Sequence, residues 1–150
     1  MTFEEKTTWV TAIVTLIVPV AYFALILRQL QVVPAEQIAY QKPMLIAIGT
    51  SIVLTIVGSI LVAIGSAVSA EIRQEGSAKS MDRTDERDVF IGRRGEIVGY
   101  YVASAGAVVV LGMTMLQYPY FWIANILYLS FALATVVSSA VKLVAYRRGF

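Results

Sequence analysis

The stretch TDERDVFIGRRGEIVGYYVASAGAVVVLGMTML (residues 84–116) decides the fold, because a run of alternating charges passes directly into a long uncharged segment. A helix rises about 1.5 Å per residue, so the uncharged part, Ile97–Leu116, can cross about 30 Å of hydrocarbon. Three further uncharged runs are at least as long: Thr8–Leu27, Pro43–Ala70 and Phe121–Val141. Since 58% of the 150 residues are hydrophobic and only 15% are charged, we predict one all-α integral membrane domain with four transmembrane helices.

Lys and Arg are distributed unevenly between the two ends of these predicted helices. Ten of the 12 basic residues fall in the N-terminal segment, the central loop 71–96 and the C-terminal segment, and only Arg28 and Lys42 fall opposite. Basic loops stay on the cytoplasmic side, so we predict that both termini are cytoplasmic. Thr84 is a suitable helix N-cap, and Asp85 and Glu86 place negative charge in the first turn. The third helix is therefore predicted to extend into the cytoplasm.

The sequence lacks the residues on which much membrane-enzyme chemistry depends. It has no Cys and no His, which excludes thiolate nucleophiles and the commonest haem and zinc ligands. Asp82 and Asp85 have oxygen ligands suited to Mg²⁺, but the run after Glu96 supplies no second acidic pair. The net charge of +2 is too small to indicate a nucleic-acid-binding surface. We predict a protein that is not an enzyme, with no metal, no cofactor and no nucleic-acid partner.

Small residues that recur every fourth position let helix backbones approach closely in a bilayer. The residues we predict to pack helices together are Ser59, Ala63 and Ala67 in the second run, Gly99 and Ala103 in the third, and Asn125 in the fourth. Packing within one chain and pairing of two chains as a homodimer are both open for the small residues. For Asn125, the alternatives are a hydrogen bond between helices and contact with a substrate.

The charged start of the third helix is the candidate binding surface. Its members are Asp85, Glu86, Arg87, Asp88, Phe90, Arg93, Arg94 and Glu96. The spacing of Arg93 and Glu96 allows a local ion pair, but such pairs contribute only about 0.2–0.5 kcal/mol. Local pairing therefore does not account for the density of charge. Phe90 shares a helical face with Arg93 and Arg94, which suits either the lipid headgroup boundary or a protein partner.

Three segments, MTFEEKTTWV (residues 1–10), DERDVFIGRRGEIVGYYV (residues 85–102) and FWIANILYLSFALATVVSSAVKLVAYRRGF (residues 121–150), carry a resemblance. Together they resemble a widespread family of small four-helix bacterial membrane proteins, and the central segment is similar to a domain of unknown function. The resemblance implies an inner-membrane location. It also implies a regulatory or immunity-type partner, because such proteins are often encoded beside a small helix-turn-helix regulator. It supplies no catalytic role for any residue.

These observations lead to two functional hypotheses. The first is a non-enzymatic accessory, regulatory or immunity-type protein of the bacterial inner membrane that acts through its charged helix on a cytoplasmic regulatory protein or on a second copy of itself. The second is a small dimeric channel or efflux-type transporter. Because no acid, Lys or Arg lies deep within the uncharged runs, such a transporter is expected to pass neutral or lipophilic solutes.

Overall fold

The computed structural model describes residues 2–72 and 86–148, and over these ranges the chain is all-helical apart from short connections. Four long helices follow one another in the described residues: α1 (Phe3–Leu30), α2 (Gln41–Ile72), α3 (Glu86–Met115) and α4 (Tyr120–Arg148). A short 3₁₀ helix, η1 (Ala35–Gln37), lies between α1 and α2. Each long helix is long and apolar enough to cross a membrane, which confirms the expected all-helical class and indicates a membrane protein.

All four helices are longer than the uncharged runs from which they were predicted. They contain between 28 and 32 residues, which corresponds to about 42–48 Å of helix against about 30 Å of hydrocarbon. The extension of α1 begins at Thr2, whose Oγ1 accepts a hydrogen bond from the Glu5 amide at 3.2 Å. Glu4 and Glu5 then lie in the first turn, where the helix dipole favours negative charge. Charged and capped ends thus continue the helices beyond their apolar centres.

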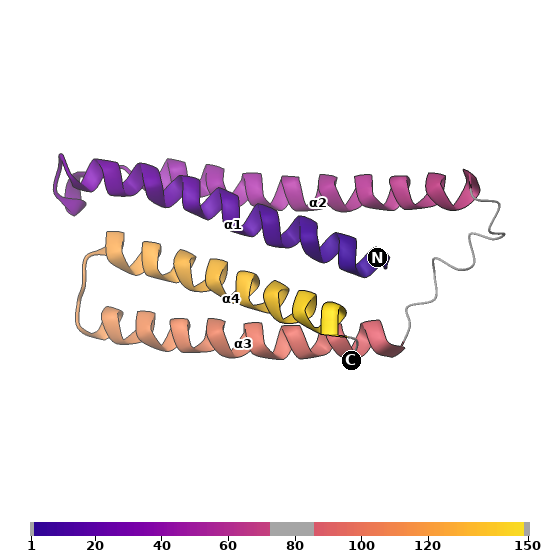
Figure 1. Cartoon of the computed structure of the whole chain (residues 1–150). Helices are drawn as coiled ribbons and strands as arrows, with labels where there is room; N and C mark the ends of the chain where they lie inside the picture. The colour runs from indigo at the N-terminus through magenta and orange to yellow at the C-terminus, as the bar shows by residue number, and fades with distance from the viewer. Residues whose placement is uncertain (1, 73–85, 149–150) are drawn as a thin grey trace.

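The helices pack as two hairpins placed side by side. Helix α1 packs against α2, α3 packs against α4, and the two hairpins meet mainly through α1 and α4. Figure 1 shows the α1–α2 pair along one side of the molecule and the α4–α3 pair along the other. The principal contacts therefore run in the order α2, α1, α4, α3, with α2 and α3 at the two edges.

The two ends of this arrangement differ in what they contain. The N-terminus, the C-terminus, the end of α2 and the start of α3 lie together, and we call this the terminal end (Figure 1). The opposite end, here the hairpin end, holds η1 and the turn between α3 and α4. In that turn Gln117 has φ 56°, a left-handed conformation, and the Tyr118 amide donates to the Met113 carbonyl at 3.0 Å. Pro119 follows and precedes α4, where a proline ring fits without loss of a helical hydrogen bond.

The buried apolar core lies near the hairpin end. Tyr22 and Ile26 of α1 pack there with Ile38, Ala47 and Phe121. Elsewhere the helices expose large apolar side chains, and only 6 to 17% of the most apolar window of each helix is buried inside the chain. An apolar surface this extensive is unfavourable in water and is expected where lipid covers the protein.

Candidate functional site

The start of α3 is held against α4 by residues that recur every fourth position. Ile91, Gly95 and Gly99 are buried. A methyl group on Gly95 would lie 2.5 Å from Lys142 Cγ and 2.9 Å from the Ser138 carbonyl oxygen. These separations are shorter than the roughly 3.5–4.0 Å of normal van der Waals contact between carbon atoms. The absence of side chains at the glycines therefore lets α3 approach α4 closely and fixes the orientation of its first turns.

Two of the predicted binding residues contact α4. Glu96 Oε1 lies 3.4 Å from Lys142 Nζ. This ion pair joins α3 to α4, although the three-residue spacing of Arg93 and Glu96 had also allowed an ion pair within α3. Asp88 is half-buried, and its side chain lies close to the hydroxyl of Tyr146. Asp88 and Glu96 thus take part in holding α3 on α4.

The remaining described members of the predicted surface lie at accessible positions of α3. Glu86, Arg87, Phe90, Arg93 and Arg94 are all exposed, and the Phe90 side chain retains 58% of its accessible surface. The structure therefore brings opposite charges and one large aromatic side chain together on the uncovered part of α3. Asp85, Thr84 and Asp82 lie outside the described residues.

Phe90 also begins an exposed apolar stripe along the outer face of α3. The stripe continues through Ile97, Tyr101, Val108 and Met115, at spacings of seven, four, seven and seven residues that keep one helical face. Tyr101 is 67% exposed and lies about three turns further into the membrane span than Phe90. The two aromatic residues thus share one face but lie at different depths.

The predicted packing residues of α2 differ in their surroundings. Ser59 and Ala63 are half-buried, whereas Ala67 is exposed. Gly58 lies beside Ser59 on the neighbouring helical face, and a methyl group added to it would lie 2.5 Å from Val10 Cγ1 of α1. The α2 face next to Ser59 and Ala63 therefore packs closely on α1 within the same chain.

The predicted packing residues of α3 face α4. Gly99 is buried, and an added methyl group would lie 3.1 Å from the Ala134 carbonyl oxygen. Ala103 is half-buried and lines, with Gly99, a shallow groove along α4. Further along, a methyl group on Gly106 would collide with Ser130. Small residues thus line the α3–α4 contact from Gly95 to Gly106.

Asn125 lies in a buried contact between α1 and α4. Tyr22 Oη donates a hydrogen bond of 2.8 Å to Asn125 Oδ1, and Asn125 Nδ2 donates to the Phe121 carbonyl oxygen at 2.8 Å. Both side chains are at most 5% exposed. An unpaired amide would be costly in a hydrocarbon environment, and the bond to Phe121 within α4 satisfies the amide nitrogen. The bond from Tyr22 joins the two hairpins near the hairpin end.

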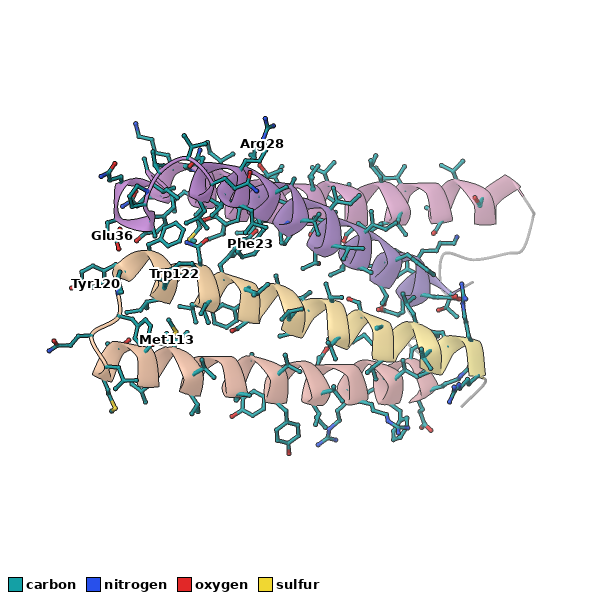
Figure 2. The ribbon with its side chains drawn as sticks, turned by 60° about the vertical axis from the view of Figure 1, so that its left-hand side comes forward. Phe23, Arg28, Glu36, Met113, Tyr120 and Trp122 are labelled. Atoms are coloured by element: carbon teal, nitrogen blue, oxygen red, sulfur yellow. The ribbon has the colours of Figure 1, made fainter. Side chains whose placement is uncertain are left out.

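Aromatic rings surround that hydrogen bond. The rings of Tyr22 and Tyr128 meet edge to face with centroids 5.2 Å apart, and Phe23 stacks on Tyr128 at 5.8 Å. Figure 2 shows Phe23 on the side of α1 that faces α4, whereas Arg28 points away from α4. Tyr120 and Trp122 lie at the start of α4 (Figure 2), a position typical of aromatic residues at a membrane interface.

Two further grooves open along the helices in the described part of the chain. One, of about 520 Å³, lies between α1 and α4 around Pro19, and among its lining residues only Thr15 carries a polar side chain. The other, of about 330 Å³, lies on α4 near the terminal end, where Arg94 of α3 and Arg148 flank an apolar surface. Close by, the Arg147 guanidinium lies 5.7 Å from the centre of the Trp9 ring, a distance at which a cation and an aromatic face attract.

Among residues 2–72 and 86–148, no group of three His, Cys, Asp or Glu side chains is placed to hold a metal ion. Comparison with protein-family models, curated proteins and solved structures gives no match to the chain. The family resemblance and its implied partner therefore stay predictions, and the candidate site rests on its own geometry.

Proposed function

We propose that this chain is a non-enzymatic membrane protein that presents the charged start of α3 to another protein. The observation that carries the proposal is the contrast between the two sides of Glu86–Glu96. One side is locked on α4 through Ile91 and Gly95, while the other exposes Glu86, Phe90 and Arg93. A surface fixed on a rigid helix loses little conformational entropy when a partner binds.

The mixture of charges favours a protein as the partner. An anionic lipid surface attracts bases and repels acids, so it does not select an acid at position 86 beside the bases that follow. A protein surface with complementary charges can read both signs, and an exposed aromatic residue such as Phe90 is a typical anchor of an interface. The pattern Glu86, Phe90, Arg93, on one face of α3, therefore fits a protein better than it fits lipid alone.

We place this surface in the cytoplasm of a bacterial cell, at the inner membrane. The excess of Lys and Arg at the N-terminus, the 71–96 segment and the C-terminus supports that orientation. The described residues that border these segments, at the start of α1, the end of α2, the start of α3 and the end of α4, share the terminal end (Figure 1). Helix α3 is about 45 Å long, which leaves about 15 Å beyond the hydrocarbon core. That excess corresponds to the Glu86–Glu96 turns when the opposite end of α3 lies at the far boundary.

The test exchanges two charges without changing their sum. In the double variant Glu86→Arg with Arg93→Glu, the net charge, the helix and the contact with α4 are kept, while the order of charges on the exposed face is reversed. Chemical cross-linking in native membranes should give a discrete higher-mass adduct with the parent chain, and the exchange variant should lose it. Equal adducts from both chains, or none from the parent, would show that the pattern is not read by a protein.

A second candidate function is supported by the groove between α1 and α4. Its volume of about 520 Å³ and apolar lining fall in the range of small-molecule sites, which suits passage of lipophilic solutes by a channel or efflux-type transporter assembled as a homodimer. Flux of a lipophilic dye into proteoliposomes distinguishes this function. Val20→Trp, which narrows the groove, should reduce flux in a transporter and should leave the α3 adduct unchanged.

A further inference from the structure

The groove on α4 near the terminal end combines two chemical features. It is lined by apolar residues of α4, among them Ala140, Val141 and Val144, and by two arginines, Arg94 of α3 and Arg148 of α4. The volume of about 330 Å³ is large enough for part of a small amphiphile. An apolar channel bordered by two cations matches a molecule with a hydrocarbon part and an anionic part.

The depth of the two cations along the helices agrees with this chemistry. At about 1.5 Å per residue, Arg94 lies about 33 Å from Leu116 and Arg148 lies about 40 Å from Phe121. The hydrocarbon core is about 30 Å thick and the bilayer with headgroups is about 40–45 Å thick. With the hairpin end at one hydrocarbon boundary, Arg94 reaches the other boundary and Arg148 the headgroup level beyond it. A phosphate of a membrane lipid is located between these two depths.

Neither cation is neutralised within the described part of the chain. Arg94 and Arg148 are exposed. Glu96, the acid nearest to Arg94 along α3, pairs instead with Lys142, with 3.4 Å between Glu96 Oε1 and Lys142 Nζ. Arg147, next to Arg148, lies instead over the Trp9 ring. Two arginines on neighbouring helices, with no acid among the residues that line the groove, form a site that favours a phosphate group. The oxygen atoms of such a group carry one or two negative charges, which guanidinium groups bind well.

We propose that this groove binds one anionic phospholipid, with its phosphate between Arg94 and Arg148 and an acyl chain along Ala140, Val141 and Val144. Basic pockets between transmembrane helices recognise anionic lipid headgroups in this way. The site is independent of the protein-docking surface, because Glu86, Phe90 and Arg93 do not line it. It assigns to Arg94 a lipid ligand in place of the protein partner predicted from the sequence.

The experiment measures phospholipid bound to the full-length chain in a non-ionic detergent by native mass spectrometry. The probes are phosphatidylglycerol, which is anionic, phosphatidylcholine of the same acyl length, and inorganic phosphate as a competitor. The parent chain should retain one phosphatidylglycerol at concentrations where phosphatidylcholine does not bind, and inorganic phosphate should not displace it. Equal binding of the two lipids would overturn the proposal, and displacement by phosphate would identify a site for the free anion.

Matched variants locate the site. Arg94→Gln with Arg148→Gln removes both guanidinium groups and should weaken phosphatidylglycerol binding about tenfold or more, since hydrogen bonds to charged groups contribute strongly. Arg93→Gln with Arg147→Gln removes the same charge from the adjacent positions and should leave the affinity within about twofold. An equal loss in both pairs would mean that only net charge matters and would refute the site.

A third variant separates the apolar part of the site from its charges. Ala140 is exposed, so Ala140→Phe fills the groove without disturbing the α3–α4 contact and keeps both arginines. It should lower the affinity for long-chain phosphatidylglycerol while circular dichroism shows unchanged helix content. Undiminished lipid binding by this variant would show that the acyl chain does not lie in the groove.

Discussion

Replacement of Gly99 by Ala tests how closely α3 and α4 approach. The added methyl group would lie 3.0 Å from Ser138 Cβ and 3.1 Å from the Ala134 carbonyl oxygen. Normal carbon contacts are about 3.5–4.0 Å, and the carbonyl belongs to the backbone and cannot rotate aside. The helices must therefore separate by several tenths of an ångström, and overpacking of this kind costs about 1–3 kcal/mol.

Gly112→Ala is the matched control on the same helix. A methyl group there would meet no atom within 4 Å, so this variant reports only the change in helix propensity, which favours Ala over Gly by about 0.5–1 kcal/mol. Because Gly99→Ala contains the same propensity term, the difference between the two variants isolates the packing cost of about 1–3 kcal/mol.

The assay is unfolding of the purified chain in mixed micelles by titration with sodium dodecyl sulfate, followed by far-ultraviolet circular dichroism. The free energy of unfolding should fall for Gly99→Ala and should stay level or rise for Gly112→Ala. Equal free energies for the two variants would refute the close approach of α3 to α4, and with it the fixed orientation of the charged turns.

Three further predictions concern other contacts. Ala63→Leu should reduce the free energy of unfolding by about 1–3 kcal/mol through overpacking against α1, whereas Ala67→Leu, at an exposed position of the same ridge, should not; equal effects would mean that the ridge does not face α1. Tyr22→Phe should lower the free energy of unfolding by about 0.6–2 kcal/mol, because it removes the buried 2.8 Å hydrogen bond between the hairpins. Tyr100 is 70% exposed, so Tyr100→Phe should cause no measurable change in the same titration. Since the chain has no Cys, Gln117→Cys gives a single thiol, which a membrane-impermeant maleimide should label from outside intact cells; labelling only after permeabilisation would reverse the proposed orientation.

The four helices could be predicted from the sequence because hydrocarbon imposes a minimum apolar length. Three of the uncharged runs each lie within one helix of the structure, and Ile97–Leu116 passes the end of α3 at Met115 by one residue. The ends were less predictable, since hydropathy cannot show where a helix stops once it leaves lipid. Helix α4 continues to Arg148, and Lys142 within that extension finds Glu96 on α3.

Contacts between helices were only partly predictable. Small residues at every fourth position indicate a packing face, but they do not name the partner helix or the limits of contact, so nothing in the sequence separates Ala63 from the exposed Ala67. The bond between Tyr22 and Asn125 joins residues separated by 103 positions. A polar residue in an apolar run indicates that a partner is needed, whereas its identity depends on the order in which the helices pack.

Ile91 was missing from the predicted packing residues, although its spacing carries a usable signal. With Gly95 and Gly99 it recurs at every fourth position, and all three are buried where α3 packs on α4. The charges around them directed attention to binding instead of packing. A helix that leaves the membrane can keep one face for packing while its other faces carry charged residues. The sequence pattern of each face must then be read separately.

The most direct test of the docking proposal places a photoreactive side chain on each end of the exposed α3 stripe. One variant carries p-benzoylphenylalanine at Phe90 and the other carries it at Tyr101, which shares the same face about three turns deeper. After illumination of native membranes, the Phe90 variant should yield a discrete protein adduct and the Tyr101 variant only lipid adducts. No protein adduct from Phe90, or equal protein adducts from both positions, would contradict a docking surface at the charged start of α3.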